Sequence, residues 1–496
     1  MFKKVTPEQA GISSENVIKF IKKLEKNGAS MHGIIFVKGE DVFAEAYWKP
    51  FHQNFHHRMY SQTKSFVSIA IGLLLEEGKL DLYDRIVDYF PEKIDGKVHE
   101  NLKNQTIREM LMMTTVGGPS SWFISEDIDR THLYLNRERQ MRRSNTIWEY
   151  DSNGAQVLCA LVEKLSGKTL LEYLREKLFN KMDAFSTAEI LKTKNNDSWG
   201  DSAMICTLRD MVKFGRLVMN YGTWKGERLM GEKYLREATS KLTDCQTSAI
   251  YSSSGEGYGY QIWRVCGNGF AFIGMGDQIT VCYPDKDLIF ACYCDNQGNP
   301  HTTQLIFSEL EDLFVDQIQD SPLPENSKKV KELEELIAKL ELRALKGKKD
   351  SPLKDRINGK QFVCEENSTG ITKFTFIFND DCTGEFRYTN AQGDKVLPFG
   401  INHNVFGKFP QLGYSNEHGG VTTTDGFMYN DAVSMKWLGD NSLLLYVQII
   451  DKYFGNMFIR FGYNDKDGFV EMGKTAENFL NEYVGRFCVK ELEDIK

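Results

Sequence analysis

Long hydrophobic runs are absent from the sequence, and so is any stripe of lysine and arginine. No apolar stretch among the 496 residues reaches the ~18 residues that a membrane-spanning helix needs. A net charge of −8, without clustered basic residues, argues against nucleic acid as a partner. Internal repeats and low-complexity tracts are missing as well. We therefore expect a globular protein that binds neither nucleic acid nor a membrane; the sequence does not indicate an oligomeric state.

Cysteine occurs ten times, but no two cysteines form the C-x-x-C pair of zinc and thioredoxin-like sites. Several lie in apolar runs, among them Cys159 in "QVLCALVEKL" and Cys292 in "FACYC", where cysteine usually acts as a small buried hydrophobe. Residues 1–20 contain no apolar core of a signal peptide, so we interpret them as the true N-terminus. Together these features predict a reducing, cytoplasmic location.

The length of the chain predicts two or three domains, because one core rarely serves so many residues. Residues 1–320 have short β-type runs near both ends and a mainly helical stretch between them. This pattern predicts an α/β (α+β) domain, an antiparallel sheet flanked by helices with a large helical insertion. Residues 321–355 are typical of a charged helical linker, with prolines at each end. Residues 356–496 alternate apolar runs with Gly/Asn/Asp turns and predict an all-β domain, a small barrel or sandwich.

One apolar helix begins with a charge. Residues 60–80 read "YSQTKSFVSIAIGLLLEEGKL", and this segment predicts a buried helix over 62–77, with Gly78 as its C-cap. Lys64 stands at the start of that helix, one turn after Ser61. Burying an ammonium group there costs free energy, so the position of Lys64 indicates that the group has a function.

Ser61 and Lys64 are suited to nucleophilic catalysis. Residues three apart on a helix share a face, and a serine nucleophile needs a neighbouring base. Burial and the positive end of the helix dipole lower the pKa of a lysine, so that it can accept a proton near neutral pH. The amide of Ser61, at a helix start, is available to an oxyanion. The structural alternative is an N-cap serine followed by a lysine that extends its amine to water.

The S-x-x-K spacing alone is a weak signal, because roughly two or three matches are expected by chance in a chain of this length. A second match, Ser351 to Lys354, lies in the polar linker segment, contains a proline and precedes no apolar helix. We therefore assign chemistry only to the first match.

Two further segments offer groups for a site. Tyr150 precedes the predicted helix "NGAQVLCALVEKLSG", and a phenol beside a lysine can act partly as phenolate and serve as a general base. A core tyrosine with its hydroxyl on water is the alternative. The segment "FAFIGMGDQITVCYP" is a strand interrupted by glycine, where a ligand or another backbone can approach. Its amides offer a second oxyanion donor; a bulge on an edge strand is the alternative.

The order of these elements resembles the serine β-lactamase/penicillin-binding-protein superfamily. Matching segments run from "TPEQAGISSENV" through "HHRMYSQTKSF" and "NTIWEYDSNGAQVLCALVEKLSG" to "GYGYQIW", and the resemblance covers residues 6–315. The chain looks closest to the class C β-lactamase-like serine hydrolases, including esterases and 6-aminohexanoate-oligomer hydrolases. The resemblance implies a β-lactamase-like domain that cleaves a small ester or amide through an acyl-enzyme, without a metal or organic cofactor.

The resemblance also implies a role for each reactive residue. Ser61 would be acylated, Lys64 would share its proton, and Tyr150 would be the general base in acylation and deacylation. The backbone amides of Ser61 and Met275 would form the oxyanion hole.

Two departures from the family pattern bear on the substrate. Tyr150 is followed by Asp-Ser-Asn, where many relatives have Ser-Asn or Ala-Asn, so either Ser152 or Asn153 takes the polar role beside the substrate. The third motif, with Gly274 at the substrate, has Phe-Ile-Gly at 272–274 in place of Lys-Thr-Gly or His-x-Gly. In β-lactamases that cationic strand helps to bind the carboxylate of the antibiotic. We therefore expect poor recognition of β-lactams and of D-Ala-D-Ala.

Other segments carry no readable motif. His52, His56 and His57 lack an acidic residue at ligand spacing, so we expect exposed loop histidines and no metal site. Two alternatives stay open beside the esterase or amidase: a β-lactamase or D-amino-acid peptidase of the same fold, and a catalytically silent binding or scaffold protein.

Overall fold

A computed structural model gives the structure of the protein, and it divides into two compact units, Met1–Glu341 and Leu342–Lys496. Among the residues that it describes, none of the helices combines the length and hydrophobicity that crossing a membrane requires. The described residues are 3–117, 125, 127–136, 141–245, 255–411, 428–451, 454–464, 466–476 and 483–492.

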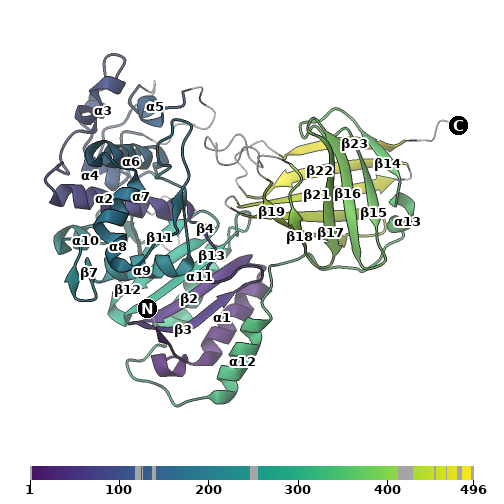
Figure 1. Ribbon diagram of the computed structural model, residues 1–496, viewed down its shortest axis with the longest axis horizontal. Helices are drawn as coiled ribbons and strands as arrows, with labels where there is room; N and C mark the ends of the chain where they lie inside the picture. Colours follow the sequence, from purple (N-terminus) through teal and green to yellow (C-terminus); the bar gives the residue numbers. More distant parts are fainter. Residues whose placement is uncertain are drawn as a thin grey trace. The chain divides into compact units, whose positions relative to one another are not determined.

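The first unit is built on an eight-stranded sheet (Figure 1). Its central pairing joins the two ends of the unit, because β2 lies antiparallel to β13 with Phe36 opposite Phe290. Both strands are buried along nearly their whole length, as expected for a sheet covered on both faces. The strands are, in sheet order, β1 (Lys3–Lys4), β3 (Asp41–Tyr47), β2 (Met31–Lys38), β13 (Leu288–Cys294), β12 (Gln278–Tyr283), β11 (Gly269–Gly274), β10 (Trp263–Val265) and β9 (Gly257–Tyr258).

Helices α1 (Ser14–Lys26), α11 (Thr302–Leu310) and α12 (Ser327–Ala338) cover one face of this sheet (Figure 1). The ring of Phe20 on α1 packs edge-on against the rings of Phe36 and Phe290, with centroids 5.5 and 5.6 Å apart. Such edge-to-face contacts add to the free energy gained by burying the rings. The first helix of the chain and strands from both ends of the unit therefore share one core.

Helix α12 lies within the segment that the sequence pattern predicted to be a linker, but the structure places it in the first unit. It packs against α1, its Leu333 is 4% exposed, and Lys22 of α1 forms an ion pair with Glu332 at 3.3 Å. The boundary between the units falls at Glu341–Leu342, so the two units share the residues of the predicted linker.

The opposite face of the sheet carries α9 (Leu208–Met219) and the helical insertion that the sequence predicted between the strands. At the centre of the insertion lies α2 (Thr63–Glu76), in which every residue from Thr63 to Leu74 is buried, as its apolar sequence indicates. It packs against α6 (Ser152–Ser166). The insertion also contains α3 (Glu100–Lys103), α4 (Ile107–Leu111), α5 (Arg130–Asn136), α7 (Leu170–Leu174), α8 (Asn180–Met182), α10 (Glu232–Ala238), β4 (His57–Arg58), β5 (Glu189–Ile190), β6 (Met204–Cys206), β7 (Thr223–Trp224) and β8 (Glu227–Arg228).

The second unit is an all-β barrel, which confirms the predicted fold class of this region. A ring of nine strands closes where β17 pairs with β19 at Ser434 and Met435, and β18 pairs with the preceding residues of β19, 430–433. Phenylalanine rings fill the core, for example Phe376 against Phe386 and Phe461. The elements are α13 (Leu353–Ile357), β14 (Gln361–Cys364), β15 (Lys373–Phe378), β16 (Thr383–Asn390), β17 (Gly393–Ile401), β18 (Val405–Lys408), β19 (Asn430–Trp437), β20 (Ser442–Ile450), β21 (Phe454–Asn464), β22 (Asp467–Lys474) and β23 (Gly485–Glu491).

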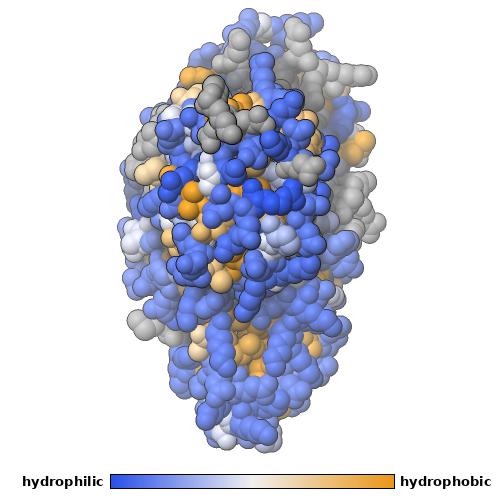
Figure 2. Space-filling view, turned by 90° about the vertical axis from the view of Figure 1, so that its right-hand side faces the viewer, coloured by the Kyte–Doolittle hydropathy of each residue, from blue (hydrophilic) through white to orange (hydrophobic). Residues whose placement is uncertain are grey.

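The face of the molecule in Figure 2 is largely hydrophilic, with hydrophobic residues in small groups between polar ones. Single exposed apolar side chains, such as Val363 on β14 and Phe469 on β22, are normal on a protein surface. We assign no binding role to them.

Candidate active site

A tight turn places Ser61 at the start of α2. The residue before it, Tyr60, has a φ of +48°, a conformation that residues other than glycine rarely adopt and that is enriched at functional sites. Two hydrogen bonds hold the turn: the amide of Met59 donates to the carbonyl of Met204 at 2.8 Å, and the hydroxyl of Thr63 donates to the carbonyl of Tyr60 at 2.6 Å. The strained turn therefore fixes the half-buried Ser61 in one orientation.

Lys64 is 1% exposed, and its amine reaches the hydroxyl of Ser61. Nζ of Lys64 lies 2.8 Å from Oγ of Ser61 and donates to the carbonyl of Asp201 at 2.7 Å. Burial lowers the pKa of Lys64 to about 8, because removal from water disfavours the charged form. An amine in this state can accept a proton from the serine close to neutral pH.

Tyr150 approaches the same serine from the loop before α6. Its hydroxyl lies near enough to the side chain of Ser61 to interact with it, and the amine of Lys64 lies 4.9 Å from the centre of its ring. The ring stacks on that of Trp263, with centroids 5.9 Å apart. Burial raises the pKa of Tyr150 well above its ordinary value, although the interaction with Ser61 opposes this shift. That direction argues against a standing phenolate on Tyr150, so Lys64 is the stronger candidate for the base.

The two polar candidates after Tyr150 differ in their surroundings. Asn153 is 1% exposed, and its amide oxygen accepts a hydrogen bond from Nη2 of Arg130 at 3.1 Å. Ser152 is half-buried at the first position of α6, directly after the N-cap residue Asp151. These contacts favour Ser152 over Asn153 as the group that faces a substrate.

The glycine-bearing strand lies directly against the serine turn. A Cβ on Gly274 of β11 would come within 2.1 Å of the carbonyl oxygen of Met59, so the glycine makes room for another backbone. Because β11 pairs with both β10 and β12, it is not the edge strand of the structural alternative.

Met275 follows this strand and is half-buried. The buried side chain of Gln278 donates from Nε2 to the carbonyls of Met275, at 3.1 Å, and Cys294, at 2.6 Å. The turn after β11 is therefore braced, and the backbone of Met275 has a defined position one residue beyond the contact with the serine turn.

Sequence reasoning missed Arg130 and Asp201. Nη1 of Arg130 lies 2.6 Å from Oδ1 of Asp201, and their side chains are only 4% and 5% exposed. Arg130 stands in "DIDRTHLY" and Asp201 in "SWGDSA", segments without a motif or a periodic pattern. Their pairing arises only from the packing of α5 beside the loop before β6.

The expectation of exposed loop histidines is wrong for His57. This residue lies on β4 and is fully buried, with Nε2 2.8 Å from Nδ1 of His32 and Nδ1 2.8 Å from the carbonyl of Arg58. Burial lowers the pKa of both imidazoles, that of His57 to about 3. His52 is exposed and His56 half-buried. Within the described ranges, no group of three or more His, Cys, Asp or Glu side chains is arranged to hold a metal ion.

Comparison with known proteins supports the same family. The family model described as Beta-lactamase matches residues 17–308. The 6-aminohexanoate-dimer hydrolase of Paenarthrobacter ureafaciens is 24% identical over 217 residues, which cover 40% of this chain and 55% of that protein. The N-acetylmuramyl-L-alanine amidase of Bacillus subtilis (strain 168) is 28% identical over 132 residues, 24% of this chain and 30% of that protein. The chain thus spans about half the length of the first relative and under a third of the second.

Solved structures show the same fold. A candidate 6-aminohexanoate-dimer hydrolase from Bacillus anthracis superimposes with a TM-score of 0.52 at 16% identity, over 64% of this chain and 86% of the other. A candidate β-lactamase from Bacteroides dorei gives a TM-score of 0.51 at 13% identity, over 61% and 98%. At these identities the likeness concerns the fold alone. The resemblance indicated by the sequence motifs is confirmed.

Proposed function

Because the chain belongs to the β-lactamase family, we propose that it is a serine hydrolase that cleaves a small ester or amide through an acyl-enzyme on Ser61. One observation carries this proposal: the amine of Lys64 lies 2.8 Å from the hydroxyl of Ser61, and the phenol of Tyr150 is near enough to interact with the same side chain. A nucleophile within hydrogen-bond reach of a base, with a third group beside them, is the arrangement that nucleophilic catalysis requires.

In the proposed acylation, neutral Lys64 accepts the proton of Ser61 as Oγ bonds to the carbonyl carbon of the substrate. The tetrahedral intermediate carries a negative oxygen, which the amides of Ser61 and Met275 stabilise. The C–O or C–N bond then breaks, and the leaving group departs with the proton that Tyr150 relays from Lys64. This leaves an ester between Ser61 and the acyl group, and a neutral amine on Lys64.

In the proposed deacylation, water takes the place of the leaving group. Tyr150 and Lys64 remove its proton while its oxygen attacks the acyl carbon, and the same amides hold the oxyanion. Collapse of the second intermediate breaks the bond to Oγ, and the proton returns to Ser61. The net reaction is hydrolysis, in which every proton that leaves Ser61 is replaced by one from water.

The third motif supports a small ester or amide rather than a β-lactam as substrate. Ile273 precedes Gly274, and its apolar side chain is 3% exposed, so it offers neither a charge nor a hydroxyl to a carboxylate. Two relatives are named a 6-aminohexanoate-dimer hydrolase and an N-acetylmuramyl-L-alanine amidase, and both names agree with this class of substrate. Ser152 is the polar side chain that we place beside the substrate, and the chemistry needs no metal or organic cofactor.

A cytoplasmic location is part of the proposal, with neither nucleic acid nor a membrane as partner. All ten cysteines of the chain are free thiols, and six of them are buried. Proteins that keep so many thiols reduced are typical of a reducing compartment.

Intact-mass spectrometry tests the proposed function. With a fluorophosphonate we expect the full chain to gain one phosphonyl group, as Oγ of Ser61 bonds to phosphorus and fluoride leaves, and we expect it to turn over p-nitrophenyl esters. Ser61→Ala should show neither reaction. Unchanged labelling of Ser61→Ala would exclude the mechanism, rapid turnover of nitrocefin would favour the β-lactamase alternative, and binding of substrates without any adduct would favour the silent binding protein.

A further inference from the structure

We infer that Arg130 is a positioning residue for this reaction, which holds Asp201 so that Asp201 in turn holds the amine of Lys64 against Ser61. The inference rests on the proposed function, and it adds a role for a residue that does not touch the nucleophile. Arg130 lies at the first position of α5, and its side chain is 4% exposed.

A continuous chain of contacts connects Arg130 to the serine. Nη1 of Arg130 lies 2.6 Å from the carboxylate of Asp201, and the backbone carbonyl of Asp201 accepts from Nζ of Lys64 at 2.7 Å. Nζ then lies 2.8 Å from Oγ of Ser61. Because the ion pair fixes the residue whose carbonyl receives the amine, a displaced Asp201 would draw Lys64 away from the serine.

The second arm of the guanidinium reaches α6. Nη2 of Arg130 donates to the amide oxygen of Asn153 at 3.1 Å, and Asn153 lies three residues after Tyr150. One side chain from α5 therefore ties together the loop that holds Lys64 and the helix start that follows Tyr150. A planar fork with several donors suits such a double contact better than a lysine would.

Charge gives Arg130 a second effect on Lys64. The carboxylates of Asp201 and Asp151 raise the pKa of the amine, whereas the guanidinium of Arg130 lowers it, and the phenol of Tyr150 faces the same amine. If Arg130 lost its charge, Asp201 would be a buried carboxylate with a buried ammonium as its nearest partner. Lys64 would then stay protonated to higher pH and would accept the serine proton less readily.

The carboxylates around Arg130 offset the cost of burying its charge. Burial lowers the pKa of Arg130, and Asp201 and Asp151 oppose that shift. A guanidinium stays charged in proteins, so we treat Arg130 as a cation. These two carboxylates and the two cations, Arg130 and Lys64, form a compact buried set in which each charge has an opposite neighbour.

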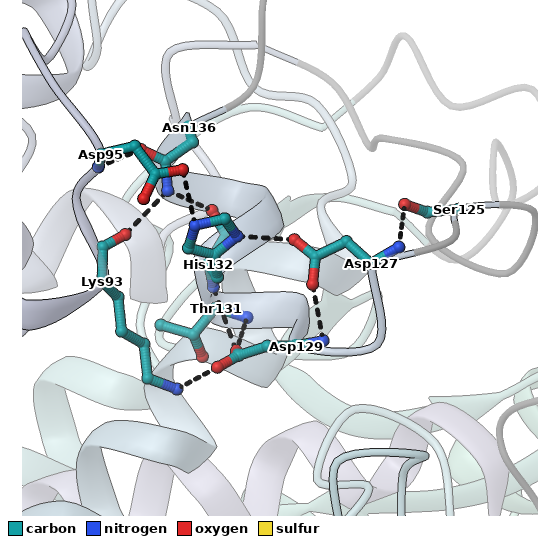
Figure 3. A network of polar contacts seen from close by, with 8 residues as sticks. All are labelled: Lys93, Asp95, Ser125, Asp127, Asp129, Thr131, His132 and Asn136. Carbon is teal, nitrogen blue, oxygen red and sulfur yellow. Dashed lines mark hydrogen bonds and ion pairs between the residues drawn. The ribbon is translucent and has the colours of Figure 1, made fainter.

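Contacts on the outer side of α5 keep Arg130 in place. Figure 3 shows the ring of His132 between two carboxylates, with Nδ1 2.6 Å from Asp127 and Nε2 2.8 Å from Asp95. Asp129 accepts from the amides of Thr131 and His132, and it also pairs with Lys93 at 2.7 Å. The helix is thus bound to the segment around Lys93 and Asp95, while Arg130, between Asp129 and Thr131, is buried on the inner side.

The pH dependence of fluorophosphonate labelling at Ser61 tests the inference. For Arg130→Gln we expect the pH at half-maximal rate to rise by ~1 unit, so that the rate below it falls about tenfold. For Asp201→Asn we expect a shift in the opposite direction, because the charge of Arg130 is then unopposed. Arg130→Gln/Asp201→Asn, in which both charges are removed, should return the midpoint towards that of the unaltered chain, and Arg130→Lys should keep it.

Two controls separate this role from a structural one. Arg85→Gln removes an exposed arginine that pairs with Asp88 at 2.8 Å, and its labelling profile should match that of the unaltered chain. A lower rate at every pH, without a shift of the midpoint in any Arg130 or Asp201 variant, would overturn the inference. If Arg130→Gln does not fold, the opposite shift of Asp201→Asn and its reversal in the double variant carry the same test.

Failure of the proposed function would be visible separately. In that case the unaltered chain itself would show no label on Ser61. An NMR titration of 13Cε-labelled lysine, with Lys64 assigned from Lys64→Arg, then measures the same midpoints without any reaction. Opposite shifts for Arg130→Gln and Asp201→Asn would support the positioning role of Arg130, and unchanged midpoints would overturn it.

Discussion

The two S-x-x-K segments of this chain share their spacing but not their surroundings. At the first, Lys64 is 1% exposed and its amine lies 2.8 Å from Oγ of Ser61. At the second, Lys354 is partly exposed, and Ser351 instead donates its hydroxyl proton to the carbonyl of Gly439 at 3.0 Å. The amide of Leu353 donates back to the hydroxyl of Ser351 at 3.3 Å. The comparison teaches that the same spacing gives a buried lysine beside its serine only where the surrounding structure removes the lysine from water, and the proposed chemistry needs that arrangement.

Helix length explains the difference. The first motif stands at the start of α2, which has 14 residues and is apolar on every side. Packing of this helix in the core buries its first residues, Lys64 among them. The second opens α13, which has 5 residues, of which Leu353 and Ile357 are buried. At the start of this short amphipathic helix the serine is buried in the preceding turn, and the lysine stays in contact with water.

The largest expected effect comes from exchanging each serine. Ser61→Ala should abolish fluorophosphonate labelling and ester turnover, because it removes the proposed nucleophile, the hydroxyl that lies 2.8 Å from Nζ of Lys64. Ser351→Ala should label at the rate of the unaltered chain. Peptide mapping of the labelled protein checks both, and a label on Ser351 would break the contrast between the two segments.

Exchanging each lysine should have the next largest effect. Lys64→Met keeps the volume of the side chain and removes the base, so we expect the labelling rate to fall ~10²–10⁴-fold. Lys354→Met should leave the rate unchanged. Stopped-flow or time-resolved mass measurement of adduct formation compares the two. A similar loss in both variants would point to a general electrostatic effect of lysine rather than to a local base.

The pH profile sharpens the same contrast. Lys64 must be neutral to accept a proton, and burial lowers its pKa to about 8. The neutral fraction falls about tenfold for each pH unit below that value, so the labelling rate should decline with this slope on the acid side and level off above it. Because the amine and the phenol of Tyr150 interact, the measured midpoint belongs to the pair. Lys354→Met should not move this midpoint, and a rate independent of pH between 5 and 9 would contradict the assignment of the base.

The smallest effect concerns stability. Ser351→Ala removes the side-chain acceptor of the Leu353 amide at the start of α13, so it should lower the free energy of unfolding of the second unit by ~1 kcal/mol. Urea denaturation followed by circular dichroism measures this change, with Ser368→Ala in the same unit as a control at an exposed serine. An effect no larger than that of the control would show that the hydrogen bond from the Leu353 amide to Ser351 does not stabilise the unit.

Periodic patterns predicted most of the fold. The helix expected over 62–77 is α2 at Thr63–Glu76, and the segment predicted as one glycine-interrupted strand forms two antiparallel strands, β11 and β12. These elements could be predicted because a fully buried helix needs an apolar run, and a buried strand needs a short apolar run bounded by turn residues. Both patterns are visible in the local sequence. The charged helix of the predicted linker was harder to place, since its contact with the first unit rests on a few apolar residues, the buried Leu333 and the partly buried Leu336 and Ile337.

Buried polar contacts were not predictable in the same way. His57 pairs with His32, and Arg130 pairs with Asp201, across 25 and 71 positions of the sequence. Neither pair can be recognised from its spacing in the sequence. The partner of a buried polar group is set by which separate elements pack together in the fold. The same holds for the relative burial of Ser152 and Asn153, which are neighbours in the sequence but lie in different surroundings.

By itself, the sequence determined that a serine and a lysine stand one turn apart at the entrance of an apolar helix, since helical spacing and hydrophobicity are local properties. Only the tertiary structure decided that Tyr150 lies beside the serine and that the carbonyl of Asp201 accepts a hydrogen bond from the amine of Lys64. It also decided that the guanidinium of Arg130 pairs with the carboxylate of Asp201. The physical reason is that desolvation and Coulomb interactions depend on distances through space, which are set when remote segments pack together.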